Sequence, residues 1–209
     1  MDRRLETTPG LVPAPGKLTY EEFLAWCDED TWAEWVDGEV VTLSPVSRRH
    51  QDLADWLMVI LRSFCEARGL GEVISAPFQM HLQTPPRGRE PDLMFLAQEH
   101  RDRLRETYLE GPADLVIAII SPESRLRERG EKFAEYEMAG VREYWLLDPE
   151  RQRADWYRLD PEGRYRLAEA DPAGLYHSQV IPGFRLRVQW LWQIPLPPVL
   201  TVLKEMGLI

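Results

Sequence analysis

Apolar residues recur along this chain with two spacings, which predict different elements. From Ser47 to Arg68 they return every three or four positions, as on one face of a helix, and Gly69 is the residue type that ends a helix in the left-handed conformation. From Ile74 to Leu82 they alternate with more polar residues, which predicts a strand with one buried face. The nearly continuous apolar run from Asp114 to Ile120 predicts a central strand covered on both faces.

Turn and cap signals mark the other elements. Thr19 and Glu22 have the spacing of a capping box, which predicts a short helix through Cys27. Asp37-Gly38 supplies the positive φ angles of a tight hairpin within Ala33 to Leu43. The remaining expected elements are a turn over Pro85 to Gly88, a strand over Asp92 to Leu96, a helix over Arg127 to Met138 stopped by Gly140, and strands over Glu143 to Leu147, Ala154 to Leu159, Arg164 to Leu167 and Phe184 to Trp190.

This order of elements predicts an α/β or α+β fold, in which a mixed central β-sheet is flanked by helices. The short aromatic segments after Pro149 predict extra antiparallel strands at the C-terminal end. We expect one domain over residues 17–190. Residues 1–16, which are rich in proline and glycine, predict a flexible arm. Residues 191–209 predict a tail with a short apolar helix, Val199 to Met206, that docks on the body or on a second copy of the chain.

Charge and composition narrow the classes of function. The 209 residues carry a formal net charge of −10, which argues against binding nucleic acid through overall charge, although local clusters of arginine can still act. No apolar run approaches the roughly 20 residues of a membrane span, and the first residues do not resemble an apolar signal segment. A cytoplasmic protein without a membrane partner is therefore expected.

Two short motifs point to phosphodiester chemistry. Hydrolysis of a phosphodiester needs converging carboxylates that hold metal ions, and a nearby lysine that orients water and offsets phosphate charge. Pro91 has no amide hydrogen for a ladder, so it places Asp92 at the start of a strand, and Lys132 follows on a helix. Each signal has an ordinary alternative, because Pro-Asp pairs are common in turns and Glu128 to Lys132 has the spacing of a surface ion pair.

Several motifs in a fixed order resemble the Uma-type restriction endonucleases of the PD-(D/E)XK nuclease superfamily. They extend from Leu18 to Phe184 and are Leu18-Thr19-Tyr20-Glu21-Glu22-Phe23, Trp35-Val36-Asp37-Gly38-Glu39, His50, Pro91-Asp92-Leu93, Asp114 to Ser124, Lys132, Tyr136, Gly140-Val141-Arg142-Glu143-Tyr144-Trp145 and Asp148-Pro149. The resemblance implies an endonuclease that acts on DNA with Mg²⁺ or Mn²⁺. It further implies that Asp92 and a glutamate on the next strand bind the metal, and that the catalytic lysine has moved to the following helix as Lys132.

The chain departs from this pattern at Ala118, where the family has the second metal-binding glutamate. Asp114 lies four residues away, about 13 Å at roughly 3.3 Å per residue, which is too far, and Glu90 is marginal at about 6.6 Å from Asp92. Glu39 is the better substitute, although it can equally be an exposed carboxylate at a strand end. The carbonyl group of Ile119 can supply a further ligand.

Further residues are candidates for supporting roles and for contacts with DNA. His50 can contact a phosphate or position a water, although a histidine near a helix start is more often a capping or packing residue. Glu90 and Glu128 are further possible supporting residues. The expected DNA contacts are the clustered arginines, whose alternative is a solvated face: Arg48, Arg49, Arg125 and Arg127. The eight tryptophans can stack on bases, but at strand spacing they fit a core or a dimer surface better; the most notable are Trp145, Trp156, Trp190 and Trp192.

Ala118 has two open explanations. Either a natural member of the family has lost or rewired catalysis, or an engineered variant had the acid removed. Both predict weak metal binding and poor cleavage of DNA. Three functions therefore remain: an impaired metal-dependent nuclease, a catalytically silent DNA-binding or regulatory module, and a homodimer-forming protein that uses its aromatic strands and apolar tail.

Overall fold

A six-stranded mixed β-sheet forms the centre of the computed structural model, which describes residues 17–27, 31–121 and 124–209. The flexible arm expected over residues 1–16 lies outside the described residues. The sheet has the order β11-β10-β9-β8-β6-β3. Its strands are β3 (Gly71–Ser75), β6 (Leu93–Ala97), β8 (Leu115–Ile119), β9 (Glu143–Asp148), β10 (Arg153–Leu159) and β11 (Tyr165–Ala168).

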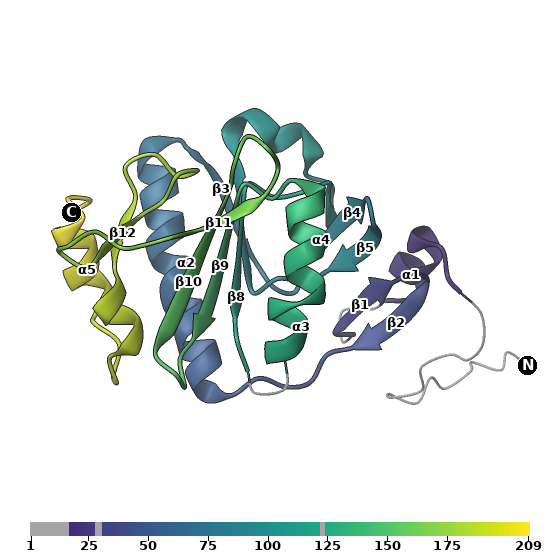
Figure 1. Ribbon diagram of the computed structural model, residues 1–209, viewed down its shortest axis with the longest axis horizontal. Coiled ribbons are helices and arrows are strands. Elements are labelled where there is room, and N and C mark those ends of the chain that lie inside the picture. Colours follow the sequence, from purple (N-terminus) through teal and green to yellow (C-terminus); the bar gives the residue numbers. More distant parts are fainter. Residues whose placement is uncertain (1–16, 28–30, 122–123) are drawn as a thin grey trace, which may run out of the picture.

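Strands β8 and β9 are parallel, and every other neighbouring pair in this sheet is antiparallel. All five residues of β8 are buried, as its continuous apolar run predicts. Alternate residues of β8 point to opposite faces: Leu115, Ile117 and Ile119 pack with helix α2 (Arg48–Arg68), while Val116 and Ala118 pack with helix α4 (Glu131–Ala139). The sheet therefore lies between two layers of helix (Figure 1).

A second, five-stranded sheet has the order β2-β1-β5-β4-β7. The hairpin predicted around Asp37-Gly38 is confirmed as β1 (Ala33–Val36) and β2 (Glu39–Thr42), with φ angles of 52° and 88° in its turn. It joins this second sheet, together with β4 (Gln79–Gln83), β5 (Pro86–Arg89) and β7 (Tyr108–Glu110).

The single strand expected from Ile74 to Leu82 is wrong. The chain leaves the central sheet after β3 and enters the second sheet at β4, and Pro77, which has no amide hydrogen for a ladder, lies between them. The turn expected over Pro85 to Gly88 is also wrong in extent, because residues 86–89 form β5 and pair with β4. The short β7 and the 3₁₀ helix η1 (Gln98–Arg103) have no counterpart in the sequence reading.

Both predicted helix caps near the N-terminal half are confirmed. Helix α1 (Tyr20–Trp26) begins with the capping box of Thr19 and Glu22, and α2 ends at Gly69 in the left-handed conformation, with a φ of 60°. The one helix expected over Arg127 to Met138 is instead two, α3 (Arg125–Arg129) and α4, separated by Gly130. Gly140 ends α4 with a φ of 86°, as expected.

The C-terminal part continues the central sheet and then crosses to α2. Strands β10 and β11 are the expected antiparallel additions, and β12 (Leu175–His177) pairs with β13 (Arg185–Arg187) in a separate ribbon. The strand expected to end at Trp190 stops at Arg187, and the 3₁₀ helix η2 (Val188–Trp192) follows.

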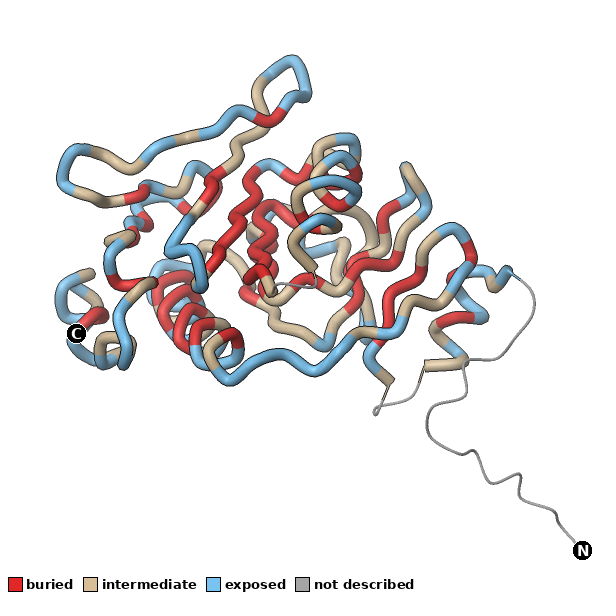
Figure 2. The backbone as a smooth tube through the Cα atoms, turned by 60° about the horizontal axis from the view of Figure 1, so that its bottom comes forward, coloured by how far each residue is buried: buried red, intermediate tan, exposed pale blue. Residues whose placement is uncertain are grey.

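The final helix α5 (Val199–Glu205) lies against α2, where Val202 joins the main hydrophobic core and the indole of Trp56 donates a 2.8 Å hydrogen bond to the carbonyl oxygen of Pro197. Figure 2 shows buried segments along the inner face of α2 and along the central strands. Among the described residues, no helix is both long and apolar enough to cross a membrane.

Candidate functional site

Asp92 and Ala118 are cross-strand neighbours at one end of the central sheet. The antiparallel pairing of β6 with β8 sets Leu93 opposite Ile117. Continuing that register by one residue places Asp92 opposite Ala118, with side chains on the same face, at the spacing of about 5 Å that such neighbours have. A glutamate at position 118 would therefore lie beside the Asp92 carboxylate.

The Asp92 carboxylate is held by two donors. Its Oδ2 accepts a 2.6 Å hydrogen bond from the backbone amide of Ile119, and its Oδ1 lies 2.9 Å from Nε2 of His50, on the first turn of α2. The other ring nitrogen of His50, Nδ1, is buried and has no hydrogen-bond partner. These contacts fix the direction of the carboxylate with the imidazole on one side and strand β8 on the other.

Lys132 lies on α4 and is buried between two carboxylates. Its Nζ is 2.8 Å from Oε1 of Glu34 on β1 and 2.8 Å from Oε1 of Glu128 on α3. Burial alone would lower the pKa of this ammonium group, but the charges of Glu128 and Glu34 outweigh burial and raise the pKa well above its usual range. The lysine therefore acts as a fixed cation.

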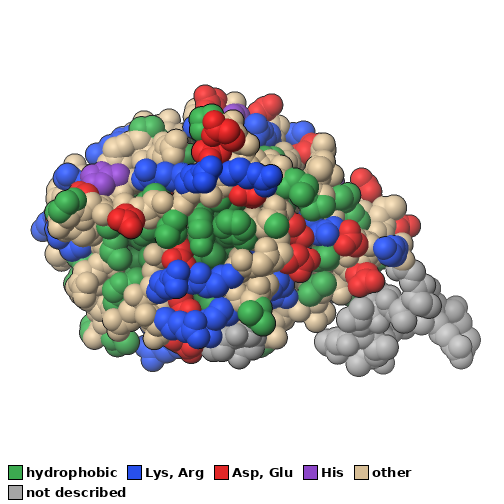
Figure 3. All heavy atoms as spheres, in the orientation of Figure 1, with side chains coloured by type: hydrophobic (Ala, Val, Ile, Leu, Met, Phe, Trp, Pro, Cys, Tyr) green, Lys and Arg blue, Asp and Glu red, His purple; other side chains and the backbone are tan. Residues whose placement is uncertain are grey.

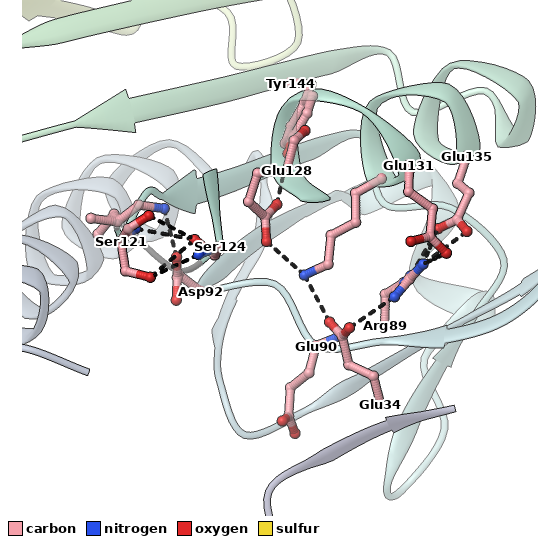
Figure 4. A network of polar contacts seen from close by, with 12 residues as sticks. Glu34, Arg89, Glu90, Asp92, Ser121, Ser124, Glu128, Glu131, Glu135 and Tyr144 are labelled. Atoms are coloured by element: carbon pink, nitrogen blue, oxygen red, sulfur yellow. Dashed lines mark hydrogen bonds and ion pairs between the residues drawn. The ribbon is translucent and has the colours of Figure 1, made fainter. Parts of the chain in front are cut away.

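Glu34 extends the network to Arg89, which is almost fully buried on β5. The guanidinium of Arg89 binds Glu34 at 2.9 Å, and it binds Glu135 and Glu131 on α4 at 2.8 and 3.0 Å (Figure 4). Burial raises the pKa of Glu34, yet Lys132 and Arg89 lower it in total to about 2. The network joins the second sheet to helix α4, which carries Lys132.

These groups open into a cleft of about 1050 Å³. Its wall includes His50, Asp92, Ala118, Glu128 and Lys132, so the structure brings these sequence-predicted residues together. The segment between β2 and α2, which passes below α3 in Figure 1, also lines the cleft, with Leu43, Pro45 and Val46.

Glu90 lines the same cleft two residues before Asp92. Its carboxylate points away from Glu34 (Figure 4). Burial and the negative charge of Glu34 raise the pKa of Glu90 to about 7, so this carboxyl group holds its proton into the neutral range.

Of the arginines predicted to contact DNA, Arg49 and Arg127 line the cleft, and Arg48 and Arg125 do not. Arg48 is exposed and lies 3.6 Å from Asp52, while Arg125 binds Asp148 and Glu150. Arg49 donates a 2.5 Å hydrogen bond to the carbonyl oxygen of Leu191.

Arg127 is different from the other predicted arginines. Its Nε is buried without a hydrogen-bond partner, and its guanidinium forms no ion pair with any residue that the structure describes.

The residues present do not fit the divalent metal site that the resemblance implies. Ala118 offers no oxygen, and Glu128 uses its two carboxylate oxygens on Lys132 and on the hydroxyl group of Tyr144, 2.9 Å away. Glu39, expected as the substitute, is exposed and does not line the cleft. Within residues 17–27, 31–121 and 124–209, no group of three or more His, Cys, Asp or Glu side chains is placed to hold an ion.

Two residues of the N-terminal hairpin region were not singled out in the sequence: Glu34, which belongs to the buried ion-pair network, and Trp32, which lines the cleft. Glu34 lies one residue before Trp35 in a recognised motif, but nothing local distinguishes it from an exposed strand glutamate. Its role becomes visible only when α4 and β5 bring Lys132 and Arg89 to it. The only sequence signal for the exposure of Trp32 is that it follows the polar residue Thr31, immediately before β1, and does not lie inside an apolar run.

Comparison with known proteins gives a family and a similar fold. Residues 20–189 match the family described as "Uma2: Putative restriction endonuclease", and the chain belongs to that family. Its fold is similar to that of a putative nuclease from Anabaena variabilis ATCC 29413 whose crystal structure is known, with a TM-score of 0.70 and 16% sequence identity over 84% of this chain and 97% of the other. No protein of curated function matches the sequence significantly. The resemblance to the Uma-type nucleases and the expected fold class are thereby confirmed.

Proposed function

We propose that the cleft is the phosphodiester-cleaving site of a DNA endonuclease that lacks one carboxylate, so that this chain cleaves DNA poorly. One observation carries the proposal: the register of β6 and β8 places Ala118 directly across from Asp92, on the face from which Lys132 approaches. Paired carboxylates beside a fixed cation are the arrangement that phosphodiester hydrolysis with a divalent metal requires.

Each remaining group has a role in this proposal. Asp92, held by His50 and Ile119, is the surviving metal-binding carboxylate, and the carbonyl group of Ile119 is a further ligand. Lys132 supplies a fixed positive charge at the reacting phosphate. Mg²⁺ or Mn²⁺ suits the site once the second carboxylate is restored, because both take oxygen ligands and need few protein carboxylates.

The test is cleavage of supercoiled plasmid with Mg²⁺ or Mn²⁺ by this chain, by Ala118→Glu and by Ala118→Glu with Asp92→Ala. We expect little cleavage by the first, clear cleavage by the second and loss of cleavage in the third. Loss of cleavage in the variant that also carries Asp92→Ala assigns the activity to this cleft and excludes a contaminating nuclease. If a folded Ala118→Glu protein is as inactive as the parent, the proposal is wrong.

A catalytically silent DNA-binding module is the second candidate. It is favoured by the contacts of Asp92, whose two carboxylate oxygens are both engaged by protein donors. DNA binding that is salt-dependent in both the parent and Ala118→Glu, without cleavage in either, would support it.

A homodimer is also proposed, and sedimentation of the full chain at several concentrations tests it.

A further inference from the structure

The cleft contains an exposed aromatic ring. Trp32 is 41% exposed, whereas the other seven of the eight tryptophans are buried or half-buried, including all four named from the sequence as possible stacking residues. Trp32 lines the same cleft as Asp92 and Ala118. Its indole forms no hydrogen bond and no ring contact with any other described residue. The exposed part of the ring and its N–H group are therefore available to a ligand.

Arg127 provides an unsatisfied cation in the same cleft. A buried N–H donor without an acceptor costs free energy, which a ligand or water that accepts from it recovers. Arginine guanidinium groups bind phosphate oxygens through paired N–H donors. The other cleft cations already have acceptors: Arg49 on the carbonyl oxygen of Leu191, and Lys132 on two carboxylates. Arg127 is thus the cleft cation, within the described residues, that is ready for a phosphate.

The charges of the molecule argue against a duplex as the ligand. Duplex DNA carries about one negative charge per 1.7 Å of its axis, and proteins that hold it neutralise many phosphates. This chain has a net charge of −10, and Figure 3 shows its basic side chains in separate groups with acidic and hydrophobic ones between them on the face in view. The cleft wall itself includes the carboxylates of Asp55, Glu90, Asp92, Glu128 and Glu150.

We propose that the cleft binds single-stranded DNA, with one nucleobase stacked on the indole of Trp32 and a backbone phosphate bound by the guanidinium of Arg127. The inference rests on the proposed function, because it names the substrate class of the same cleft. Every base offers a π-face to an aromatic side chain only when it is unstacked, as in a single strand. Stacking also supplies affinity without the many cations that this acidic chain lacks. The apolar residues Leu43, Pro45 and Val46, which also line the cleft, suit a nucleobase.

Binding is measured by fluorescence anisotropy with the full chain, in a chelating buffer that prevents cleavage. The probes are a labelled single-stranded 12-mer, the same 12-mer as a duplex, and a 12-mer of abasic sugar-phosphate units. We expect the single strand to bind more tightly than the duplex. Trp32→Ala should weaken its binding by about fivefold or more, the scale of one base–aromatic stack, and Trp32→Phe should retain most of it. On the abasic strand, Trp32→Ala should have no effect.

Arg127→Gln tests the phosphate contact. It should weaken binding to the base-containing and abasic strands alike, and it should reduce the slope of log K against log salt by about 0.7, the value for one phosphate contact on a single strand. Arg48→Gln is the matched control, because Arg48 is exposed, lies near Asp52 and does not line the cleft. Circular dichroism confirms that each variant is folded.

The outcomes separate this inference from the proposed function. Preference for the duplex, or unchanged single-strand binding in folded Trp32→Ala, overturns the inference. If either occurs while Ala118→Glu still cleaves plasmid, the nuclease proposal stands alone. If single-strand binding depends on Trp32 and Arg127 while Ala118→Glu remains inactive, the inference holds and the nuclease proposal fails.

Discussion

Lys132 and Glu34 form a buried ion pair with 2.8 Å between Nζ and Oε1. The pair joins helix α4 to strand β1, which belongs to the second sheet. Glu34 also binds Arg89, so one carboxylate contacts two buried cations. The lysine that the sequence predicts to be catalytic thus forms a structural link between helix α4 and the second sheet.

Glu34→Ala should destabilise the protein by about 3–5 kcal/mol, the usual cost of removing one partner from a buried ion pair. Lys132 would keep only Glu128, and Arg89 would lose its contact with β1. Urea denaturation at pH 7 measures the loss. The matched control is Glu39→Ala on the same hairpin, where the side chain is exposed and a change within about 0.5 kcal/mol is expected. Equal effects of the two substitutions would contradict the structural role of Glu34.

The carboxylate of Glu34 also makes the folding stability depend on pH, in a direction that follows from its pKa shift. The pKa of Glu34 is lowered in the folded protein to about 2 from an ordinary value of 4.5. Its contribution to stability is therefore present above pH 4.5 and is lost as the pH falls toward 2. The stability difference between the parent and Glu34→Ala should accordingly shrink below pH 4.5.

The contribution of Glu90 to folding stability changes with pH in the opposite direction to that of Glu34. Its folded-state pKa is raised to about 7, so its contribution to stability is full below pH 4.5 and is lost as the pH rises through 7. Glu90→Gln keeps a neutral side chain of nearly the same shape at every pH. The variant should match the parent at pH 4 and exceed it in free energy of unfolding at pH 8. Parallel unfolding free energies of the two proteins between pH 4 and 8 would show that burial does not hold this proton.

How far the sequence predicts this structure depends on how local each signal is. The caps at Thr19 and Gly69 and the turn at Asp37-Gly38 are properties of a few neighbouring residues, and the structure confirms them. The strand expected over Ile74 to Leu82 failed because alternation of apolar residues does not report which sheet a strand joins. The alternation of polar and apolar residues cannot show that the chain leaves one sheet and enters another.

The same contrast holds for the cleft. Asp92, Ala118 and Lys132 could be found because the family resemblance orders them along the chain, and the register then brings them to one cleft. Glu39 was predicted from the hairpin and Glu34 was not considered, since sequence position alone does not reveal which side chain of a hairpin faces Lys132. The structure shows the difference, because Glu34 is fully buried and Glu39 is exposed. Trp32 was not singled out among the eight tryptophans, because the exposure of a side chain depends on the whole fold.

His50 should orient Asp92 rather than contact the metal itself. In the Ala118→Glu background, His50→Ala removes one of the two donors to the Asp92 carboxylate, and we expect Mn²⁺ affinity to fall about 10- to 100-fold, the usual effect of losing such a supporting hydrogen bond. Isothermal titration calorimetry measures the affinity independently of cleavage. His100→Ala is the matched control, because His100 forms a similar contact with Asp114, 3.0 Å away, and does not line the cleft. Equal Mn²⁺ affinity in both variants would remove His50 from the site.

Lys132→Arg in the Ala118→Glu background separates catalysis from structure. Arginine keeps the positive charge between Glu34 and Glu128, so the folded protein should lose little of its stability, but its planar guanidinium cannot present a compact ammonium group to the reacting phosphate. We expect plasmid cleavage to fall by about a hundredfold, the scale of losing one positioned donor, while the unfolding midpoint in urea changes little. Lys132→Met is the contrasting variant, because it leaves Glu128 without its cation and Glu34 with Arg89 alone, and it should destabilise the fold itself. Full cleavage by a folded Lys132→Arg protein would assign Lys132 to the ion-pair network alone.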